Sequence, residues 1–226
     1  MKKAAIFIAL AMILLLSVGG CRRQPKPREA EEPRAKFIPA TKPSAVAGQR
    51  IYQANCAACH GPGGAGDGPK APSLPEKPKD FTDEEFMRGE QPQEFYEAVT
   101  EGKGQVMPAF KKKLSAQARW DALFFAWSRS TSPARIAAGR EIYTKHCVAC
   151  HGKNGDGRGL AGRRPEARPP RLDDPRFMMQ AESRKFYDAV TKGKGAMPWF
   201  ARKLNDDQRW QVVEYTWTFV YEPPAE

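Results

Sequence analysis

Two pentapeptides hold the residues best suited to chemistry: CAACH at residues 56–60 and CVACH at residues 147–151. On a helical turn, two cysteines three positions apart lie on one face, where they can form thioethers with the two vinyl groups of one porphyrin. The histidine that follows can then reach the iron. C-x-x-C-H is the spacing of c-type haem attachment, and its repetition predicts two covalent haem c groups. The residues predicted to attach haem are Cys56, Cys59, Cys147 and Cys150, and the residues predicted to bind iron on one side are His60 and His151.

Two other kinds of site share part of this pattern. A C-x-x-C pair alone also occurs in zinc sites and in redox dithiols. A structural zinc site needs four ligands, whereas each pentapeptide supplies three. A methionine further along each half suits haem iron better than zinc, so the haem interpretation is favoured.

Met107 and Met197 are the predicted second iron ligands. Each precedes a proline, and they follow the motif histidines by 47 and 46 residues. Proline favours extended geometry in the residue before it, which suits a side chain presented from a loop. The competing side chains, for which packing or a surface position is expected instead, are Met87, Met178, Met179 and His146.

The N-terminus has the features of an export signal over residues 1–20. Two lysines precede an apolar run over residues 4–18, and these fifteen residues are short for a membrane span of roughly 20. The run ends in VGGC at residues 18–21. This resembles the lipobox of bacterial lipoproteins, which implies cleavage before Cys21 and lipidation of that cysteine. The alternative is an uncleaved anchor helix, and both alternatives place the bulk of the protein outside the cytoplasm.

Proline and charge dominate residues 21–44. Such a composition cannot form a core, so we expect a disordered, lipid-anchored tether.

The rest of the sequence is one unit written twice. An offset of 91 residues superposes the two haem motifs, and an offset of 90 superposes the two later methionines. We expect a first domain over residues 45–128, a linker over 129–134 and a second domain over 135–222.

Each unit predicts three main helices. A first helix carries glycine and tyrosine on one face, at Gly48 and Tyr52 or their equivalents Gly139 and Tyr143, and it ends in the haem motif. Middle helices are predicted over 93–100 and 182–191, and last helices over 115–128 and 206–220 with Ser115 and Asn205 as N-caps. Neither unit contains a convincing strand, so the predicted fold class is all-α.

The order of these features resembles class I cytochromes c, arranged as a tandem dihaem protein. The resemblance covers residues 45–221 and rests on the C-x-x-C-H motif, the later Met-Pro and the flanking helices, each present twice. It implies a compact helical wrap around one haem per unit, with iron bound by His60 and Met107 and by His151 and Met197. It also implies that the first and last helices cross near the glycine and tyrosine of the first helix.

Charge differs between the units. Residues 45–128 contain 10 basic and 11 acidic residues, whereas residues 134–222 contain 17 and 11. A basic surface can bind nucleic acid, but export and haem argue against that partner, and an acidic redox partner or anionic lipid fits better. The alternative is a solvated surface without a partner. The basic residues that cluster in the second unit are Arg163, Arg164, Arg168 and Arg171.

The expected function is transfer of electrons between redox partners at the outer face of a bacterial membrane. An iron with six ligands has no open position for a substrate, and methionine ligation raises the reduction potential. An alternative with the same chemistry is the cytochrome subunit of a larger membrane oxidase or reductase. A dihaem peroxidase or a sulfur-compound dehydrogenase needs an accessible or unusual ligand position, and a haem-based sensor needs a signalling domain.

Overall fold

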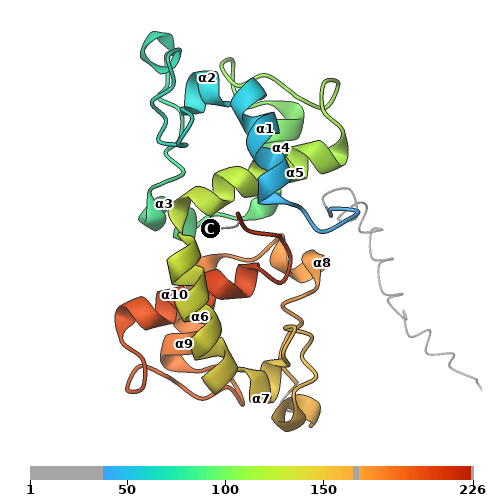
Figure 1. Cartoon of the computed structure of the whole chain (residues 1–226), viewed down its shortest axis with the longest axis vertical. Helices are drawn as coiled ribbons and strands as arrows, with labels where there is room; N and C mark the ends of the chain where they lie inside the picture. Colours follow the sequence, from blue (N-terminus) through green and yellow to red (C-terminus); the bar gives the residue numbers. More distant parts are fainter. Residues whose placement is uncertain (1–37, 165–167, 225–226) are drawn as a thin grey trace, which may run out of the picture. The chain divides into compact units, whose positions relative to one another are not determined.

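The computed structural model describes residues 38–164 and 168–224 and is helical throughout (Figure 1). The predicted signal and Cys21, together with most of the predicted tether, lie outside the described residues. Within the described ranges there is no β-strand, only three isolated bridges, so the all-α prediction is confirmed. The helices of the first repeat are α1 (Ala45–Asn55), α2 (Ala57–His60), η2 (Ala71–Ser73), α3 (Glu84–Arg88), α4 (Pro92–Glu101), α5 (Ala116–Trp127) and η3 (Ser128–Ser130). Those of the second are α6 (Pro133–His146), α7 (Val148–His151), η4 (Leu160–Arg163), α8 (Pro175–Met178), α9 (Ser183–Lys192) and α10 (Asp206–Trp217).

The main helices start and stop where local chemistry favours it. The Ser115 hydroxyl accepts a hydrogen bond from the Ala118 amide at the start of α5, and Asn205 forms a capping box with Gln208 at the start of α10. Both N-caps were predicted. The helices α3 and α8 were not predicted. Each begins after an aspartate, Asp83 or Asp174, whose carboxylate accepts amide hydrogens of the first turn.

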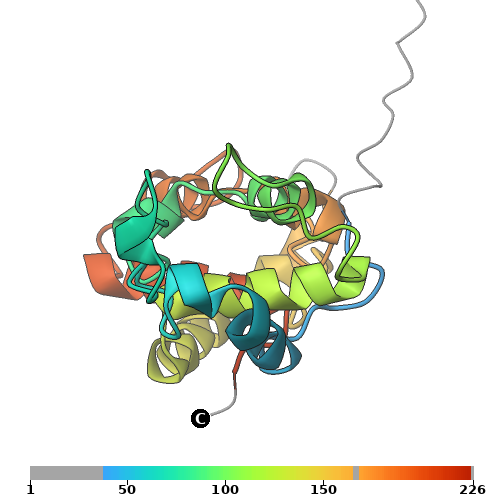
Figure 2. The same cartoon turned by 90° about the horizontal axis from the view of Figure 1, so that it is seen from above.

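The first and last helices of each repeat cross in contact, α1 with α5 and α6 with α10, and Figure 2 shows the former pair from above. A methyl group on Gly48 would lie 1.9 Å from the Asp121 carbonyl oxygen, and one on Gly139 would lie 2.0 Å from that of Gln211. The backbones therefore touch where glycine permits it, as the family resemblance implied. This crossing fixes the helix that leads into each haem motif.

The last residues of the predicted tether pack against the helical part. Pro43 is buried, and its carbonyl accepts a hydrogen bond from the Glu222 amide at 2.8 Å. Ser44 caps α1 and receives support from Asp121, whose carboxylate accepts from the Ser44 amide at 2.9 Å. The chain is thus ordered before the predicted start of the first domain, because a buried proline and a helix cap hold it.

Corresponding positions of the two repeats contact each other. The Trp127 and Trp217 rings, which are equivalent in the repeat, have centroids 5.1 Å apart. Gln91 and Glu182 are also equivalent, and the amide of the first donates to the carboxylate of the second at 3.1 Å. Such self-pairing is what an isologous, two-fold interface produces, here within a single chain. We call these contacts the inter-repeat interface.

A pseudo-two-fold axis relates the two repeats and passes between Trp127 and Trp217. The inter-repeat interface has one end on each side of this pseudo-axis, and the two ends are equivalent in position but differ in chemistry. Phe124 stacks on Tyr221 with centroids 4.7 Å apart. The equivalent pair at the other end is Glu214 and Thr131, which form a hydrogen bond of 2.6 Å. Glu214 also binds Arg135, with nitrogen–oxygen distances from 2.8 Å. One pattern of contacts is therefore filled by rings at one end and by a charged cluster at the other.

Candidate haem sites

Each haem motif forms one short helical turn. Cys56 ends α1, with its amide donating to the Tyr52 carbonyl at 2.8 Å, and it begins α2. The amides of Cys59 and His60 both donate to the Cys56 carbonyl, at 3.1 and 2.9 Å. The second motif repeats this geometry in α7, with the same distances. The structure thus brings the two cysteines and the histidine of each motif onto one turn, as a thioether-linked porphyrin requires.

The four motif cysteines form no disulfide, and burial perturbs the first cysteine of each motif. All four motif cysteines are free and half-buried. Burial, followed by the neighbouring thiol, raises the pKa of Cys56 to about 11 and that of Cys147 to about 12. A redox dithiol works through a thiolate with a lowered pKa, so these thiols do not match that class. Among the described side chains, no three of the kinds that bind metal form a cluster, and the zinc interpretation gains no support.

The motif histidines are held as neutral rings. Burial lowers the pKa of His60, against a smaller opposing effect of the Lys79 carbonyl, and burial lowers the pKa of His151. His60 Nδ1 lies 3.4 Å from the Lys79 carbonyl oxygen, and its ring stacks on Phe81 with centroids 4.8 Å apart. A neutral imidazole with one nitrogen engaged presents the other as a metal ligand. His151 Nδ1 is buried and has no hydrogen-bond partner among the described residues.

A glycine-rich loop closes over the C-terminal end of each motif helix. In the first repeat, the amides of Gly66, Gly68 and Lys70 donate to the carbonyls of His60, Cys59 and Ala58, at 2.8–3.1 Å. These carbonyls have no partner within so short a helix, so the loop replaces the missing turn. The second repeat has the equivalent bonds from residues 157 and 159.

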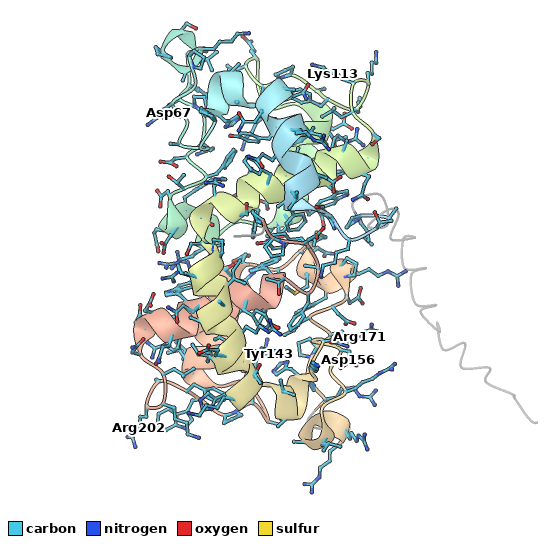
Figure 3. The ribbon with its side chains drawn as sticks, in the orientation of Figure 1. Asp67, Lys113, Tyr143, Asp156, Arg171 and Arg202 are labelled. Carbon is cyan, nitrogen blue, oxygen red and sulfur yellow. The ribbon has the colours of Figure 1, made fainter. Side chains whose placement is uncertain are left out.

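A buried tyrosine fastens each loop to the first helix. The Tyr52 hydroxyl donates to the Gly61 carbonyl at 3.1 Å, and the Tyr143 hydroxyl donates to the Gly152 carbonyl at 2.9 Å. Figure 3 labels Tyr143 on α6 and Asp156 in the loop after α7. The predicted glycine–tyrosine face therefore has two roles: the glycine admits the last helix, and the tyrosine holds the haem-motif loop.

The predicted methionines lie in matched turns after the middle helices. Met107 pairs with Lys103 by two backbone hydrogen bonds of 3.0 and 3.2 Å, and Met197 pairs with Lys194 by bonds of 3.1 and 3.0 Å. Both methionines are half-buried. A methyl group on Gly102 would lie 2.6 Å from the Met107 carbonyl oxygen, so the glycine before the turn allows its close return.

The competing side chains lie elsewhere. Met87, Met178 and Met179 are at most 3% exposed and belong to the core, in agreement with the packing role expected for them. His146 ends α6 and contacts the Phe200 ring edge-on at 6.1 Å. The ligand assignment to Met107 and Met197 stays a prediction, since no iron is placed by these contacts.

The surroundings of the motifs fit a porphyrin. Partly buried Phe81, Phe86 and Phe95 pack against the core together with Cys56 in the first repeat. In the second repeat, Phe186 and Val190 do so together with Cys147 and Val148. Two half-buried thiols, an imidazole and a flanking apolar surface are the donor set and the environment that haem c takes. Sequence reasoning missed the packing of Phe81 on the motif histidine, although its position after the glycine-rich loop is a usable signal.

The predicted basic cluster is exposed but only partly free. Arg163, Arg164 and Arg168 are exposed. Arg171 instead binds the Asp173 carboxylate through two nitrogens at 2.9 Å, and it lies close to Asp156 in Figure 3. Three of the four predicted arginines therefore remain without a bonded carboxylate among the contacts described.

Among the described helices, none has the length and apolar character needed to cross a bilayer.

Comparison with known proteins places both repeats in one family. The model of the family described as cytochrome C oxidase, cbb3-type, subunit III matches residues 43–125 and again residues 134–215. The cbb3-type cytochrome c oxidase subunit FixP of Sinorhizobium medicae is 26% identical over 173 residues, covering 71% of this chain and 55% of the relative. Subunit CcoP of Azospirillum brasilense is 28% identical over 182 residues, covering 72% and 58%. The chain thus spans little more than half the length of these relatives.

Among solved structures, the chain is similar to one from the Kuenenia stuttgartiensis reducing HAO-like protein complex Kustc0457/Kustc0458. The two are 23% identical, with a TM-score of 0.34 over 81% of this chain and 99% of the other. The twofold family match confirms the tandem cytochrome architecture and supports haem c as the cofactor. This chain belongs to the family of subunit III of cbb3-type cytochrome c oxidases.

Proposed function

We propose that this protein is the dihaem cytochrome subunit of a membrane-bound oxidase complex of the cbb3 type, in which it passes electrons toward the other subunits. The observation that carries the proposal is the twofold family match over two haem motifs of the same geometry. The curated relatives are named as oxidase subunits, which favours this assignment over the free carrier expected first from sequence.

Two covalent haem c groups are proposed, one for each motif. Cys56 and Cys59 hold the first by thioethers, and Cys147 and Cys150 hold the second. His60 and Met107 bind one iron, and His151 and Met197 bind the other. The haem iron supplies one-electron chemistry, and a thioether ligand favours its ferrous state. The chain's own contribution is to keep each site apolar and each imidazole neutral, which the contacts of α2 and α7 support.

The proposed location is the outer face of a bacterial membrane. Lipidation of Cys21 would anchor the chain, and more than one acyl chain makes such anchoring stable. Other oxidase subunits are the proposed partners, together with an electron donor whose acidic surface meets the exposed arginines of the second repeat.

Copurification tests the assignment to a complex. We expect the chain, tagged at its C-terminus and extracted in mild detergent from its native membranes, to bring down the catalytic subunit of an oxidase. Membranes from a strain that carries Cys21→Ala serve as the control for the anchor. Isolation of the chain alone, with full haem content, would instead favour a free carrier.

Haem content and ligation are tested on the purified chain. We expect a haemochrome assay to find two haem c per chain, and one in the double variant Cys56→Ala, Cys59→Ala. Met107→Ala should keep both haems attached, because the thioethers do not involve it. It should abolish the methionine-to-iron charge-transfer band of that haem and open it to carbon monoxide, and Met197→Ala should do the same for the other. Loss of the band in Met87→Ala instead would contradict the assignment.

A further inference from the structure

A row of aromatic rings runs from the first haem motif to the inter-repeat interface. It starts at His60, whose ring stacks on Phe81 with centroids 4.8 Å apart. Phe81 contacts Phe95 on α4 at 5.7 Å, and Phe95 contacts Trp127 at the end of α5, also at 5.7 Å. Each separation lies in the range of interacting aromatic pairs. The proposed iron ligand of the first haem is therefore joined to the interface by consecutive ring contacts.

The row continues into the second repeat. The Trp127 ring meets the Trp217 ring at 5.1 Å across the pseudo-axis. Trp217 contacts Phe186 on α9 at 5.9 Å, and Phe186 contacts Phe177 on α8 at 5.9 Å. Phe95 and Phe186 are equivalent in the repeat. Each repeat therefore contributes the same two rings in the same order, a phenylalanine followed by the central tryptophan.

The two tryptophans at the centre are held in place. Trp127 is 5% exposed and Trp217 is 2% exposed. The Trp217 indole nitrogen donates to the Ser183 hydroxyl at 2.8 Å. Both side chains project from the last turn of a long helix whose other end is capped. The central contact therefore has little room to vary.

The row is not symmetric at its ends. Phe81 and Leu172 occupy equivalent positions, since the amide of each donates to the loop glycine carbonyl at 2.7 Å, from Phe81 to Gly64 and from Leu172 to Gly155. Leu172 is 6% exposed and has no ring. Aromatic contacts thus reach the motif histidine in the first repeat, whereas a saturated side chain takes that place beside the second motif.

We propose that Trp127 and Trp217 form the electronic contact between the two haem-binding repeats, a role that rests on the proposed function. With haem held by both motifs, exchange would pass one electron from the ferrous iron bound in one repeat to the ferric iron bound in the other. No bond is formed or broken, no proton moves, and the rings are unchanged at the end. The two indole rings are in contact and tilted by 59°, and aromatic rings in contact couple a donor to an acceptor more strongly than saturated side chains across the same gap. A purely structural role would use the same rings only for packing, and the experiment must separate the two.

The experiment compares ring removal with ring retention in the full holoprotein. Trp127→Met and Trp217→Met, singly and together, fill the space with a flexible side chain that has no ring. Trp127→Phe and Trp217→Phe keep a ring in a smaller volume. Trp120→Met is the matched control, because Trp120 is 1% exposed on the same helix and stacks on Tyr96 outside the row. Should the tryptophan variants fail to fold, Phe186→Leu interrupts the row at a half-buried position.

The readout is electron exchange within one molecule. In half-reduced samples, proton NMR of the haem methyl groups gives the exchange rate between the two haems, and redox titration gives both potentials. We expect the double methionine variant to slow exchange by about tenfold or more, equivalent to ~1.4 kcal/mol of activation free energy. The phenylalanine variants and Trp120→Met should stay near the wild-type rate, with potentials unchanged throughout.

Each outcome decides between the proposals. Wild-type exchange in the double methionine variant, or an equal slowing in Trp120→Met, would overturn the role of the tryptophan pair and leave the dihaem assignment standing. Absence of two haem c groups in the haemochrome assay would instead overturn the proposed function. Slow exchange only where a row tryptophan loses its ring, with potentials unchanged and exchange in Trp120→Met, which also loses a buried ring, near the wild-type rate, would establish the contact.

Discussion

The crossing of α1 and α5 can be tested by a single added methyl group. In Gly48→Ala the new carbon would start 1.9 Å from the Asp121 carbonyl oxygen. A real contact of this kind requires at least 3.0 Å, so the helices must separate by about 1 Å at the crossing. The neighbouring contact of Tyr52 with Phe125, at 5.0 Å between centroids, lies beside this point and would loosen with it.

The expected cost is at the upper end of overpacking, about 3 kcal/mol. For a chain of this size, that corresponds to a fall of roughly 6–12 °C in the thermal midpoint. Gly139→Ala should behave alike, because its methyl would lie 2.0 Å from the Gln211 carbonyl oxygen. Guanidinium and thermal unfolding of the holoprotein, followed by far-ultraviolet circular dichroism, would measure both.

Gly63→Ala is the matched control. Nothing lies within 4 Å of the methyl it would add, and its backbone angle does not require glycine. We expect no measurable change in either midpoint. If Gly48→Ala were as stable as Gly63→Ala, the close approach of the two backbones would be refuted, together with the argument that it positions the haem motif.

Three further predictions concern the loops and the surface. Tyr52→Phe removes the hydroxyl that donates to the Gly61 carbonyl, so the free energy of unfolding should fall by about 1 kcal/mol in denaturant titrations. The loss should be no larger, because that carbonyl keeps the Gly64 amide as a second donor; an unchanged free energy of unfolding would mean that the hydroxyl does not fasten the loop. The hydrogen bond from Arg171 lowers the pKa of the Asp173 carboxyl below its ordinary 3.8. The pair therefore stabilises the fold above that pH, and the stabilisation is lost as the pH falls through the lowered pKa. Asp173→Asn should flatten this part of the curve of stability against pH, and an unchanged curve would count against the pair. Replacing the exposed Arg163, Arg164 and Arg168 by glutamate should slow reduction by an acidic donor at low salt. The effect should shrink above ~0.1 M salt, where the Debye length falls to about 10 Å; equal rates for the variant and the wild type at all salt concentrations would exclude steering by these arginines.

Local sequence signals predicted most of the fold. The repeat, the main helices and the two N-caps follow from spacing and from residue type, and Gly48 and Gly139 mark the helix crossings. The helices α3 and α8 were missed because they have five and four residues, too few to show a period. Only their caps, Asp83 and Asp174, carry a signal at the sequence level.

The site was predicted in part for a similar reason. The histidines and cysteines are adjacent in sequence, so a motif identifies them. The ring contacts of Phe81 with His60 and of Trp127 with Trp217 join residues far apart in the chain, and their pairing depends on tertiary packing. Alignment of the repeats matches the two tryptophans with each other, but it does not show that equivalent residues touch.

The self-paired inter-repeat interface has a consequence for how the protein can change. In a dimer of identical subunits, one codon change alters an interface at two places simultaneously. In a single chain that carries both copies, codons 124 and 214 vary independently, and so do codons 131 and 221. One end now holds Phe124 on Tyr221, while the other holds Glu214 with Thr131 and Arg135. Carrying both repeats in one chain thus lets two units of common pattern acquire unlike surroundings. Unlike surroundings are the condition for electrons to pass preferentially in one direction between the two repeats.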